Sequence, residues 1–351
     1  MNLSHLFRFC ACIALTCCQI AQADSTFPAP NWTVQEARAA AALIDTPAAV
    51  GPLFELARTG RDDALLESLA DVATRAAWTQ PAREHVLYTF AAGVADLAPD
   101  TVGRKVMDWL LAYQSRTLVP HDHHPAAGVP LYRVSAAAAG SLNAWERQAA
   151  SADSARLLRS GAPAWLEAYR AAGPARRLGL MGGLGQAEPE QLDRLADSAL
   201  ERLPAEPDLT PVAARAGVLL EEPAILGQAV ATGGGPGLAP ELRSAARAFN
   251  ELERAAVLRH AVTHAPPGNA SLAIAELAPG LLHQPEVTEL LFAKLGDRQI
   301  GSAAALALSA SKSPQVRERL NELARGGAGL EASRAEIALG TPDNLIEEVQ
   351  R

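Results

Sequence analysis

The chain has 351 residues and a formal net charge of −8 at pH 7, with 39 acidic residues against 31 basic ones. This acidic balance opposes a general affinity for nucleic acid or anionic lipid, so we expect no nucleic-acid partner. The four cysteines are confined to the first part of the chain, at Cys10, Cys12, Cys17 and Cys18.

Residues 1–23 have the pattern of a secretory signal peptide. Arg8 precedes an apolar run from Cys10 to Ile20, no acidic residue occurs, and small residues at Ala21 and Ala23 favour cleavage after Ala23. The run is too short to span a membrane, and no later stretch reaches the roughly 20 apolar residues that a span needs. We expect a periplasmic or secreted protein without cysteine, disulfide or thiolate metal ligand. Lipid attachment needs a cysteine preceded by small residues, a pattern that LTCC and ALTC fit poorly.

Short alanine-rich segments separated by proline and glycine run from Val34 to the C-terminus, and alternating β-branched or aromatic runs are missing. This pattern predicts an all-α protein of many short helices. Thr33 followed by Glu36 predicts a capping box at the first of them. Prolines that suit the first turn of a helix predict further helix starts at Pro47, Pro81, Pro189, Pro285, Pro314 and Pro342.

Aromatic residues divide the chain into two regions. All 5 tryptophans and all 4 tyrosines precede residue 170, whereas Phe249 and Phe292 are the aromatic residues beyond it. We therefore predict an aromatic-rich helical region at 24–172 and an aliphatic one at 173–351. Bulky core packing between widely spaced helices is one interpretation of the first region. The alternative is an aromatic-lined groove that binds a ligand or peptide through residues such as Trp109 and Tyr113.

The stretch VPHDHHPAAGVP, residues 119–130, concentrates potential metal ligands between prolines. The four adjacent ligands are His121, Asp122, His123 and His124. They could bind zinc, but neighbouring side chains of an extended backbone point apart, and beyond the predicted signal peptide His85 is the one other histidine in this half. We expect a long polar connection between helices without a joint metal site. Leu131 or Tyr132 should anchor its far end, where the next helix begins.

Three further motifs have simpler structural interpretations. His260 and His264 lie four residues apart without the glutamate of a metalloprotease, and they suit the last turns of a helix. The S-x-x-K pattern at 309–312 lacks its partner motifs. The glycine runs at 178–185 and 231–237 fit no phosphate-binding pattern, so we interpret them as helix breakers. The first run also suits a close approach of two helices.

An internal repeat occupies the C-terminal region. SLAIAELA at 271, SAAALALS at 302 and SRAEIALG at 333 recur at intervals of 31 residues and share Ser, Ala and Leu at their first, third and seventh places. Each precedes a second predicted helix: PEVTELLFAKL, SPQVRERLNELA and TPDNLIEEVQR. Two helices in a unit of this length predict an α-solenoid, an α-α superhelix of stacked antiparallel helix pairs.

The segment SAAALALSASKSPQVRERLNELA resembles the HEAT-repeat family, with a small-residue first helix, a proline turn and an amphipathic second helix. Val316 and Arg317 match that pattern, whereas the equivalent pairs at 287–288 and 345–346 lack the arginine. The resemblance is clear over 268–351 and weak upstream, where tetratricopeptide-like or irregular helical repeats stay open. It implies an interaction scaffold, because this family has no common catalytic residues.

These patterns lead to two functional hypotheses. The first is a non-catalytic binding or scaffold protein, without cofactor, that presents a helical-repeat surface to a protein, peptide or envelope partner. The alternative is a metal-dependent hydrolase centred on His121–His124. Residues that we expect to contact a partner are His121, Asp122, His123, His124, Tyr132, Trp109 and Tyr113. Positions that recur at helical spacing should form the repeat core: Ala304, Leu308, Val316, Leu320 and Leu323.

Overall fold

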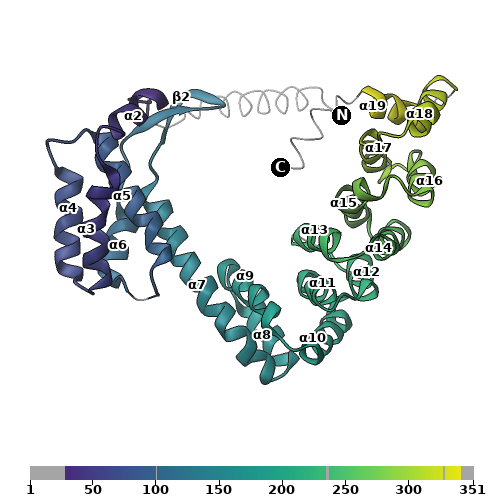
Figure 1. The fold of residues 1–351 in the computed structure, drawn as a ribbon, viewed down its shortest axis with the longest axis horizontal. Coiled ribbons are helices and arrows are strands. Elements are labelled where there is room, and N and C mark those ends of the chain that lie inside the picture. Colours follow the sequence, from purple (N-terminus) through teal and green to yellow (C-terminus); the bar gives the residue numbers. More distant parts are fainter. Residues whose placement is uncertain (1–27, 100, 235–236, 327–328, 341–351) are drawn as a thin grey trace, which may run out of the picture. The chain divides into compact units, whose positions relative to one another are not determined.

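The structure of the protein is a computed structural model in which helices predominate (Figure 1). It describes residues 28–99, 101–234, 237–326 and 329–340. Within these ranges it contains the α-helices α2 to α19 and one two-stranded sheet, which confirms the all-α prediction. The predicted signal peptide, Pro342 and the last predicted helix lie outside the described residues. No single described helix is long and apolar enough to cross a membrane, although the bent pair α2 and α3 meets that test jointly.

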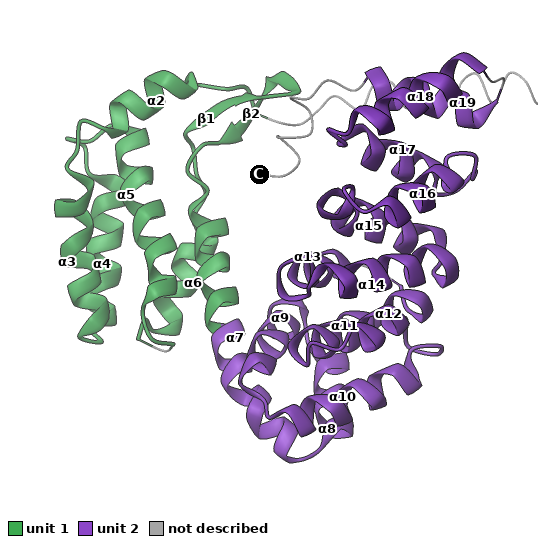
Figure 2. Cartoon of the chain, turned by 45° about the vertical axis from the view of Figure 1, so that its right-hand side comes forward, with its two compact units in different colours: residues 1–145 green, residues 146–351 purple. Residues whose placement is uncertain are grey.

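The chain forms two compact units, residues 1–145 and 146–351 (Figure 2). The division lies within helix α7 (Val134–Arg159), upstream of the change in aromatic content near residue 173. Trp165 and Tyr169 belong to the hydrophobic core of the second unit, so aromatic content does not follow the packing.

Unit 1 is built around helix α5. This helix contacts α2, α3 and α4, and it buries Val86, Leu87 and Phe90 completely. The predicted capping box is confirmed, because the Thr33 hydroxyl accepts from the Glu36 amide and the Glu36 carboxylate accepts from Thr33. The elements are α2 (Val34–Ala41), α3 (Thr46–Arg58), α4 (Asp62–Thr74), α5 (Gln80–Gly93), η1 (Val94–Asp96), α6 (Arg104–Ala112), β1 (Leu118–His121) and β2 (His124–Pro130).

Unit 2 contains the remaining helices, all of them short. The predicted first-turn prolines are confirmed here at α10, α16 and α18, and in unit 1 at α3 and α5. The elements are α8 (Ala162–Ala171), α9 (Pro174–Gly183), η2 (Leu184–Gln186), α10 (Pro189–Arg202), η3 (Pro207–Leu209), α11 (Thr210–Leu219), α12 (Pro223–Thr232), α13 (Leu238–Ala248), α14 (Glu251–His264), α15 (Pro267–Leu277), η4 (Pro279–Leu281), α16 (Pro285–Lys294), α17 (Gly301–Ser309), α18 (Pro314–Gly326) and α19 (Leu330–Gly340).

Most helices of unit 2 stack in two layers. One layer contains α11, α13, α15, α17 and α19, each of which contacts the next, and the other contains α10, α12, α14 and α16 (Figure 1). The three repeated segments lie in α15, α17 and α19. We expected each of them to pair with the helix that follows it. Each of them packs instead on the helix before it, α15 on α14, α17 on α16 and α19 on α18, and α17 packs at least as closely on α19.

The predicted repeat core is confirmed at four of its five positions. Ala304, Leu308, Val316 and Leu320 are buried, and Ala304 is not exposed at all. Leu323 is only partly buried, so its predicted burial was wrong. It lies one turn beyond Leu320 on α18, whose described contacts are mainly with α19.

Helix α9 ends at Gly183, inside the glycine run at 178–185, and a 3-10 turn follows it, which agrees with the predicted helix break. The glycines of this run also pack closely against α7. A Cβ atom on Gly179 would lie 2.3 Å from the Arg147 carbonyl oxygen, and one on Gly183 would lie 2.4 Å from that of Ser151. The predicted close approach of two helices is thus confirmed as well. At 231–237 the prediction holds, since α12 ends at Thr232.

Alanine substitutions at Gly183 and Gly182 should have opposite effects on the free energy of unfolding. Gly183→Ala forces a methyl group into the α7 backbone and should destabilise the protein by about 1–3 kcal/mol. Gly182→Ala has nothing within 4 Å of its new methyl group and should be neutral or stabilise by up to about 1 kcal/mol, as a helix interior favours alanine. Urea unfolding of both variants measures the difference. Equal midpoints would contradict the close approach of α7 and α9.

Leu320→Ala should lower the free energy of unfolding by about 2–5 kcal/mol, because it leaves a cavity at a fully packed position. Leu323→Ala on the same helix is the matched control and should cost clearly less, since that side chain is only partly buried. Thermal melts and urea curves of the two variants test this order. A Leu320→Ala variant as stable as the wild type would place Leu320 on the surface.

Candidate functional site

Residues 119–130 form an antiparallel β-hairpin, where we predicted a long polar loop between helices. Val119 pairs with Val129 and Pro120 with Gly128, and the register is irregular just before the turn. Proline cannot donate to a ladder, so the three prolines argued against strands. A two-stranded sheet, however, consists of edge strands only, where proline is tolerated. The local structure of this stretch was therefore predicted wrongly.

A buried carboxylate on α5 holds the base of the hairpin. Glu84 is not exposed to solvent, and its two oxygens accept hydrogen bonds from the backbone amides of Arg116 at 2.5 Å and Thr117 at 3.0 Å. The Gln80 side chain donates a third hydrogen bond to the same carboxylate at 2.6 Å. A buried charge needs such partners to offset its lost hydration. Glu84 therefore fixes where the chain enters β1.

The segment before α2 holds the other parts of the hairpin. The Asn31 side chain accepts from the Leu118 amide and donates to the Arg116 carbonyl, both at 2.9 Å. The Gly128 amide donates to the Pro28 carbonyl at 2.7 Å. A Cβ atom on Gly128 would lie 2.7 Å from that carbonyl oxygen, so only glycine permits this contact. The hairpin is thus bound along both strands.

The histidines cluster at the tip of the hairpin. The His121 ring centroid lies 5.9 Å from that of His123 and 5.6 Å from that of His124, so these side chains converge instead of pointing apart. The tight turn, which an extended backbone lacks, causes this. The His123 amide donates to His121 Nδ1 at 3.1 Å and so occupies the lone pair of that nitrogen. Asp122, His123 and His124 are exposed. In the described ranges no group of three or more His, Cys, Asp or Glu residues is arranged to hold a metal ion.

Tyr132 lies at the far end of the hairpin, close to where α7 begins, as predicted for an anchor. Its ring lies 5.0 Å from that of His85 and 6.2 Å from that of Tyr88. The Ser115 hydroxyl donates to its carbonyl oxygen at 2.5 Å. Burial lowers the pKa of His85, whose Nδ1 lies 3.3 Å from the Thr46 hydroxyl. His85 is thus engaged in this cluster at the base of the hairpin.

Trp109 lies on α6, and Tyr113 follows one turn later, just after the helix ends. Their ring centroids are 5.5 Å apart. Both are partly buried against the core of unit 1. Burial raises the pKa of the Tyr113 hydroxyl, and the nearby Glu84 carboxylate raises it further. This packing favours the core interpretation of the aromatic residues. The predicted contact residues therefore lie in three separate places: at the tip of the hairpin, at its base and against the core of unit 1.

The histidine pair of α14 lies where it was predicted. His260 and His264 are exposed in the last turns of that helix, with ring centroids 4.7 Å apart. His283 does not join this pair. Its Nε2 lies 2.9 Å from Glu251 Oε2. The S-x-x-K pattern coincides with the end of α17 at Ser309.

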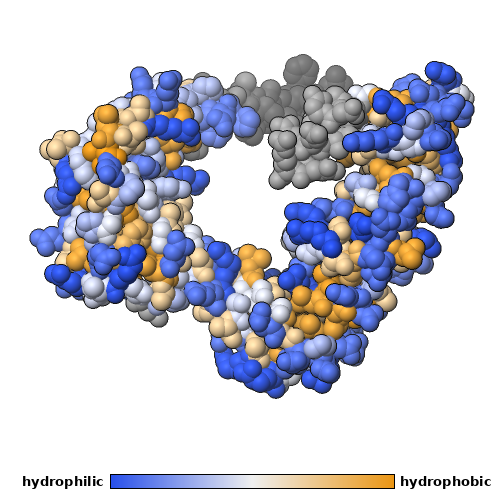
Figure 3. Space-filling view, in the orientation of Figure 1, coloured by the Kyte–Doolittle hydropathy of each residue, from blue (hydrophilic) through white to orange (hydrophobic). Residues whose placement is uncertain are grey.

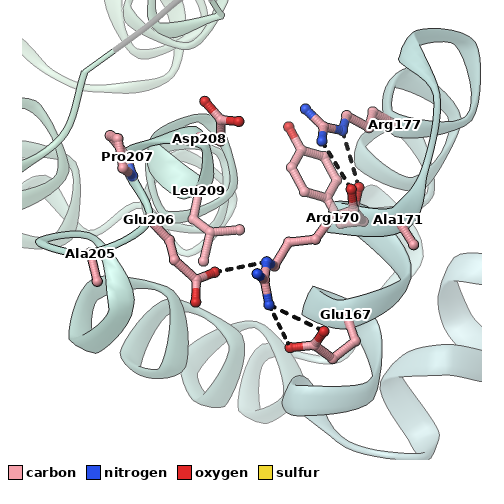
Figure 4. A pocket seen from close by; sticks show the side chains of 10 residues that line it. Glu167, Arg170, Ala171, Arg177, Ala205, Glu206, Pro207, Asp208 and Leu209 are labelled. Carbon is pink, nitrogen blue, oxygen red and sulfur yellow. Dashed lines mark hydrogen bonds and ion pairs between the residues drawn. The ribbon is translucent and has the colours of Figure 1, made fainter.

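A charged cavity in unit 2 was not predicted from the sequence. It has a volume of about 560 Å³ and lies between α8, α9 and η3 (Figure 4). Arg170 pairs with Glu167 at 3.1 Å and with Glu206 at 3.1 Å, and Glu167 also binds Arg202 at 3.0 Å. The residues that line it are Glu167, Tyr169, Arg170, Ala171, Arg177, Ala205, Glu206, Pro207, Asp208 and Leu209.

Arg177 and Tyr169 form one wall of this cavity. Arg177 Nε donates to the Tyr169 carbonyl at 3.1 Å and Nη2 donates to the Arg170 carbonyl at 3.0 Å. The Arg177 guanidinium lies over the Tyr169 ring, 5.2 Å from its centroid, and Trp165 stacks on the same ring at 5.4 Å. Burial raises the pKa of Tyr169, against the opposing effect of Arg177. The stretch WLEAYRAAGPARR carries these residues, but only the fold brings them to η3.

A second cavity, of about 570 Å³, lies between α3 and α4 in unit 1. Pro52, Leu53 and Leu56 form its apolar wall, and Arg75 pairs with Asp71 at its edge. The Arg75 guanidinium also covers the Trp78 ring at 4.4 Å. The Arg75–Asp71 pair is thus satisfied within the protein, whereas Arg61 and Glu67, which also line this cavity, make no ion pair among the described residues.

No family model, curated protein or solved structure matches this chain. The resemblance to HEAT repeats thus rests on the residues of the repeated segments.

Zinc titration of the protein by calorimetry should show no submicromolar binding at the hairpin tip, because His121 Nδ1 already accepts from the backbone and the other imidazoles are exposed. The same titration with His123 and His124 both changed to alanine is the control. Tight binding that disappears in the double variant would contradict this expectation and favour the hydrolase hypothesis.

Proposed function

We propose that this chain is an exported, non-catalytic scaffold protein that binds a protein or peptide partner on the helical-repeat surface of unit 2. The observation that carries the proposal is the exposure of large apolar side chains at equivalent positions of consecutive repeats. Leu306 on α17 is 57% exposed and Ile337 on α19 is 61% exposed, and they lie 31 residues apart in the repeated segments. Ala275 holds the same position on α15 and is also exposed.

Leu306 lies on a face of the layer that the described helices leave uncovered. α17 contacts α15 and α19 within its layer and α16 in the other layer. Its buried residues, including Ala304 and Leu308, face those neighbours, so Leu306 points to the side that no described helix covers. Exposed apolar side chains that repeat at one position of a stack are typical of a contact surface.

Charged side chains border this apolar row. Arg243 on α13 pairs with Glu276 on α15 at 3.0 Å, next to Ala275, and the surface over α13 is hydrophilic (Figure 3). A row of apolar residues bordered by charged ones resembles the apolar centre and polar rim of protein interfaces. The resemblance to HEAT repeats supports the same kind of function.

The metal-dependent hydrolase stays the second candidate because of one observation, the convergence of three imidazoles at the hairpin tip. The zinc titration described above tests it. The scaffold is favoured because His121 Nδ1 already accepts a backbone hydrogen bond.

Affinity purification from the envelope fraction of the source bacterium tests the scaffold function. The wild type should capture one stoichiometric partner, and changing Leu306 and Ile337 together to glutamate should abolish that capture, since two charges would enter an apolar contact. Leu252→Glu is the matched control, because Leu252 is 80% exposed but lies on α14 in the other layer. A partner that binds the double variant as well as the wild type would contradict the proposed surface.

A further inference from the structure

The cavity between α8, α9 and η3 contains one cation without an anionic partner. Arg170 is neutralised by Glu167 and Glu206, and Arg202 by Glu167. Arg177 has no carboxylate within 4.0 Å among the described residues, although it lines the same cavity. Its neighbour Arg176 is different, since it pairs with Asp153 at 3.1 Å. The cavity thus has a positive group available for a ligand.

The Arg177 guanidinium is fixed in position before any ligand binds. A guanidinium has five N–H donors, of which two here bind the carbonyl oxygens of Tyr169 and Arg170. The three remaining donors belong to the Nη1 and Nη2 atoms. They form the free edge of the planar group, which matches the two oxygens of a carboxylate. Because the carbonyl groups hold this edge still, a ligand loses little side-chain entropy on binding it.

Tyr169 adds a second unused donor to the cavity wall. The residue is only 6% exposed, yet its hydroxyl has no hydrogen-bond partner among the described residues. Most of the ring is buried, but the hydroxyl itself is not among the buried atoms without a partner, so it reaches the cavity and can donate to a ligand there. The hydroxyl belongs to the ring that Arg177 covers, at 5.2 Å from guanidinium carbon to ring centroid.

We propose that Arg177 and Tyr169 bind the carboxylate group of a short peptide segment in this cavity. The carboxylate would accept from Nη1 and Nη2 of Arg177 and from the Tyr169 hydroxyl. Asp208 is exposed at the opposite wall and makes no ion pair within the described residues, so it favours a cationic group next to that carboxylate. The site is separate from the free face of α15, α17 and α19, so the inference does not depend on the proposed partner.

The charge of the lining favours a carboxylate over a phosphate. Three carboxylates, of Glu167, Glu206 and Asp208, balance the guanidinium groups of Arg170, Arg177 and the nearby Arg202, so the site has no net positive charge to attract a dianion. A volume of about 560 Å³ falls within the usual range of ligand sites and admits a short peptide.

The probes are three short peptides and inorganic phosphate. Acetyl-Lys-Ala has a free C-terminal carboxylate, acetyl-Lys-Glu-amide has only a side-chain carboxylate, and acetyl-Lys-Ala-amide has neither. Binding is followed by ¹⁹F NMR of the full chain labelled with 5-fluorotryptophan, because Trp165 stacks on Tyr169 at 5.4 Å. Trp165→Phe assigns its signal. We expect a saturable shift of this signal with at least one carboxylate peptide and none with the amide. The peptide that binds more tightly identifies the source of the carboxylate.

Two variants and two controls test the residues. Tyr169→Phe keeps the ring stacking and should weaken binding about tenfold, the usual effect of one hydrogen bond to a charged group. Arg177→Gln should weaken it by about tenfold or more, and urea unfolding checks that this variant remains folded. Arg176→Gln and Tyr88→Phe should bind like the wild type, because Arg176 pairs with Asp153 and Tyr88 belongs to unit 1.

The proposal is overturned if no carboxylate peptide gives a saturable shift, or if the amide or phosphate binds as tightly. It is also overturned if Tyr169→Phe and Arg177→Gln both bind like the wild type.

Discussion

A chain made of short helices has many helix ends, and each end leaves carbonyl groups without a helical partner. This protein satisfies several of them with arginine. Arg83, Arg177 and Arg254 each donate to a carbonyl eight residues earlier, at or near the end of the preceding helix, at 3.1–3.3 Å. Arg334 on α19 likewise donates to the Leu295 carbonyl, at the end of α16. The partial negative charge of a helix C-terminus favours these cations.

This constraint gives a physical reason for the basic residues that the chain uses. Only three of its 31 basic residues are lysine. A guanidinium can donate to two carbonyl groups at once in a fixed geometry, which an ammonium on a flexible stem does less well. The Asn269 side-chain amide also donates to two carbonyl groups at the end of a helix, those of Val230 and Gly233 at the end of α12, both at 2.8 Å. Polar side chains thus hold successive helices together at their ends, while alanine and leucine pack between them.

Local patterns in the sequence predicted the features that depend on nearby residues. The Thr33 capping box begins a helix, as predicted, and so do the first-turn prolines within the described residues. The segments that repeat every 31 residues also lie in helices. Features that need distant residues were missed. The hairpin depends on Glu84 and Asn31, which lie far from it in the sequence, and its prolines argue locally against strands. The close helix approach at Gly183 was predicted, but not that its partner is the α7 backbone, which lies about 30 residues earlier in the sequence. Arg177 resembles any surface arginine until α8 and η3 surround it.

The connections of the hairpin also set an order for folding. Glu84 reaches the Thr117 amide across 33 residues, and Asn31 reaches the Leu118 amide across 87. Closing such loops costs entropy that only formed contacts repay, whereas α5 can form from local hydrogen bonds. The hairpin therefore docks late, once α5 presents Glu84. Because its ladder has only two strands, it is also the part of unit 1 from which amide protons should exchange with solvent before the helices around Phe90 open.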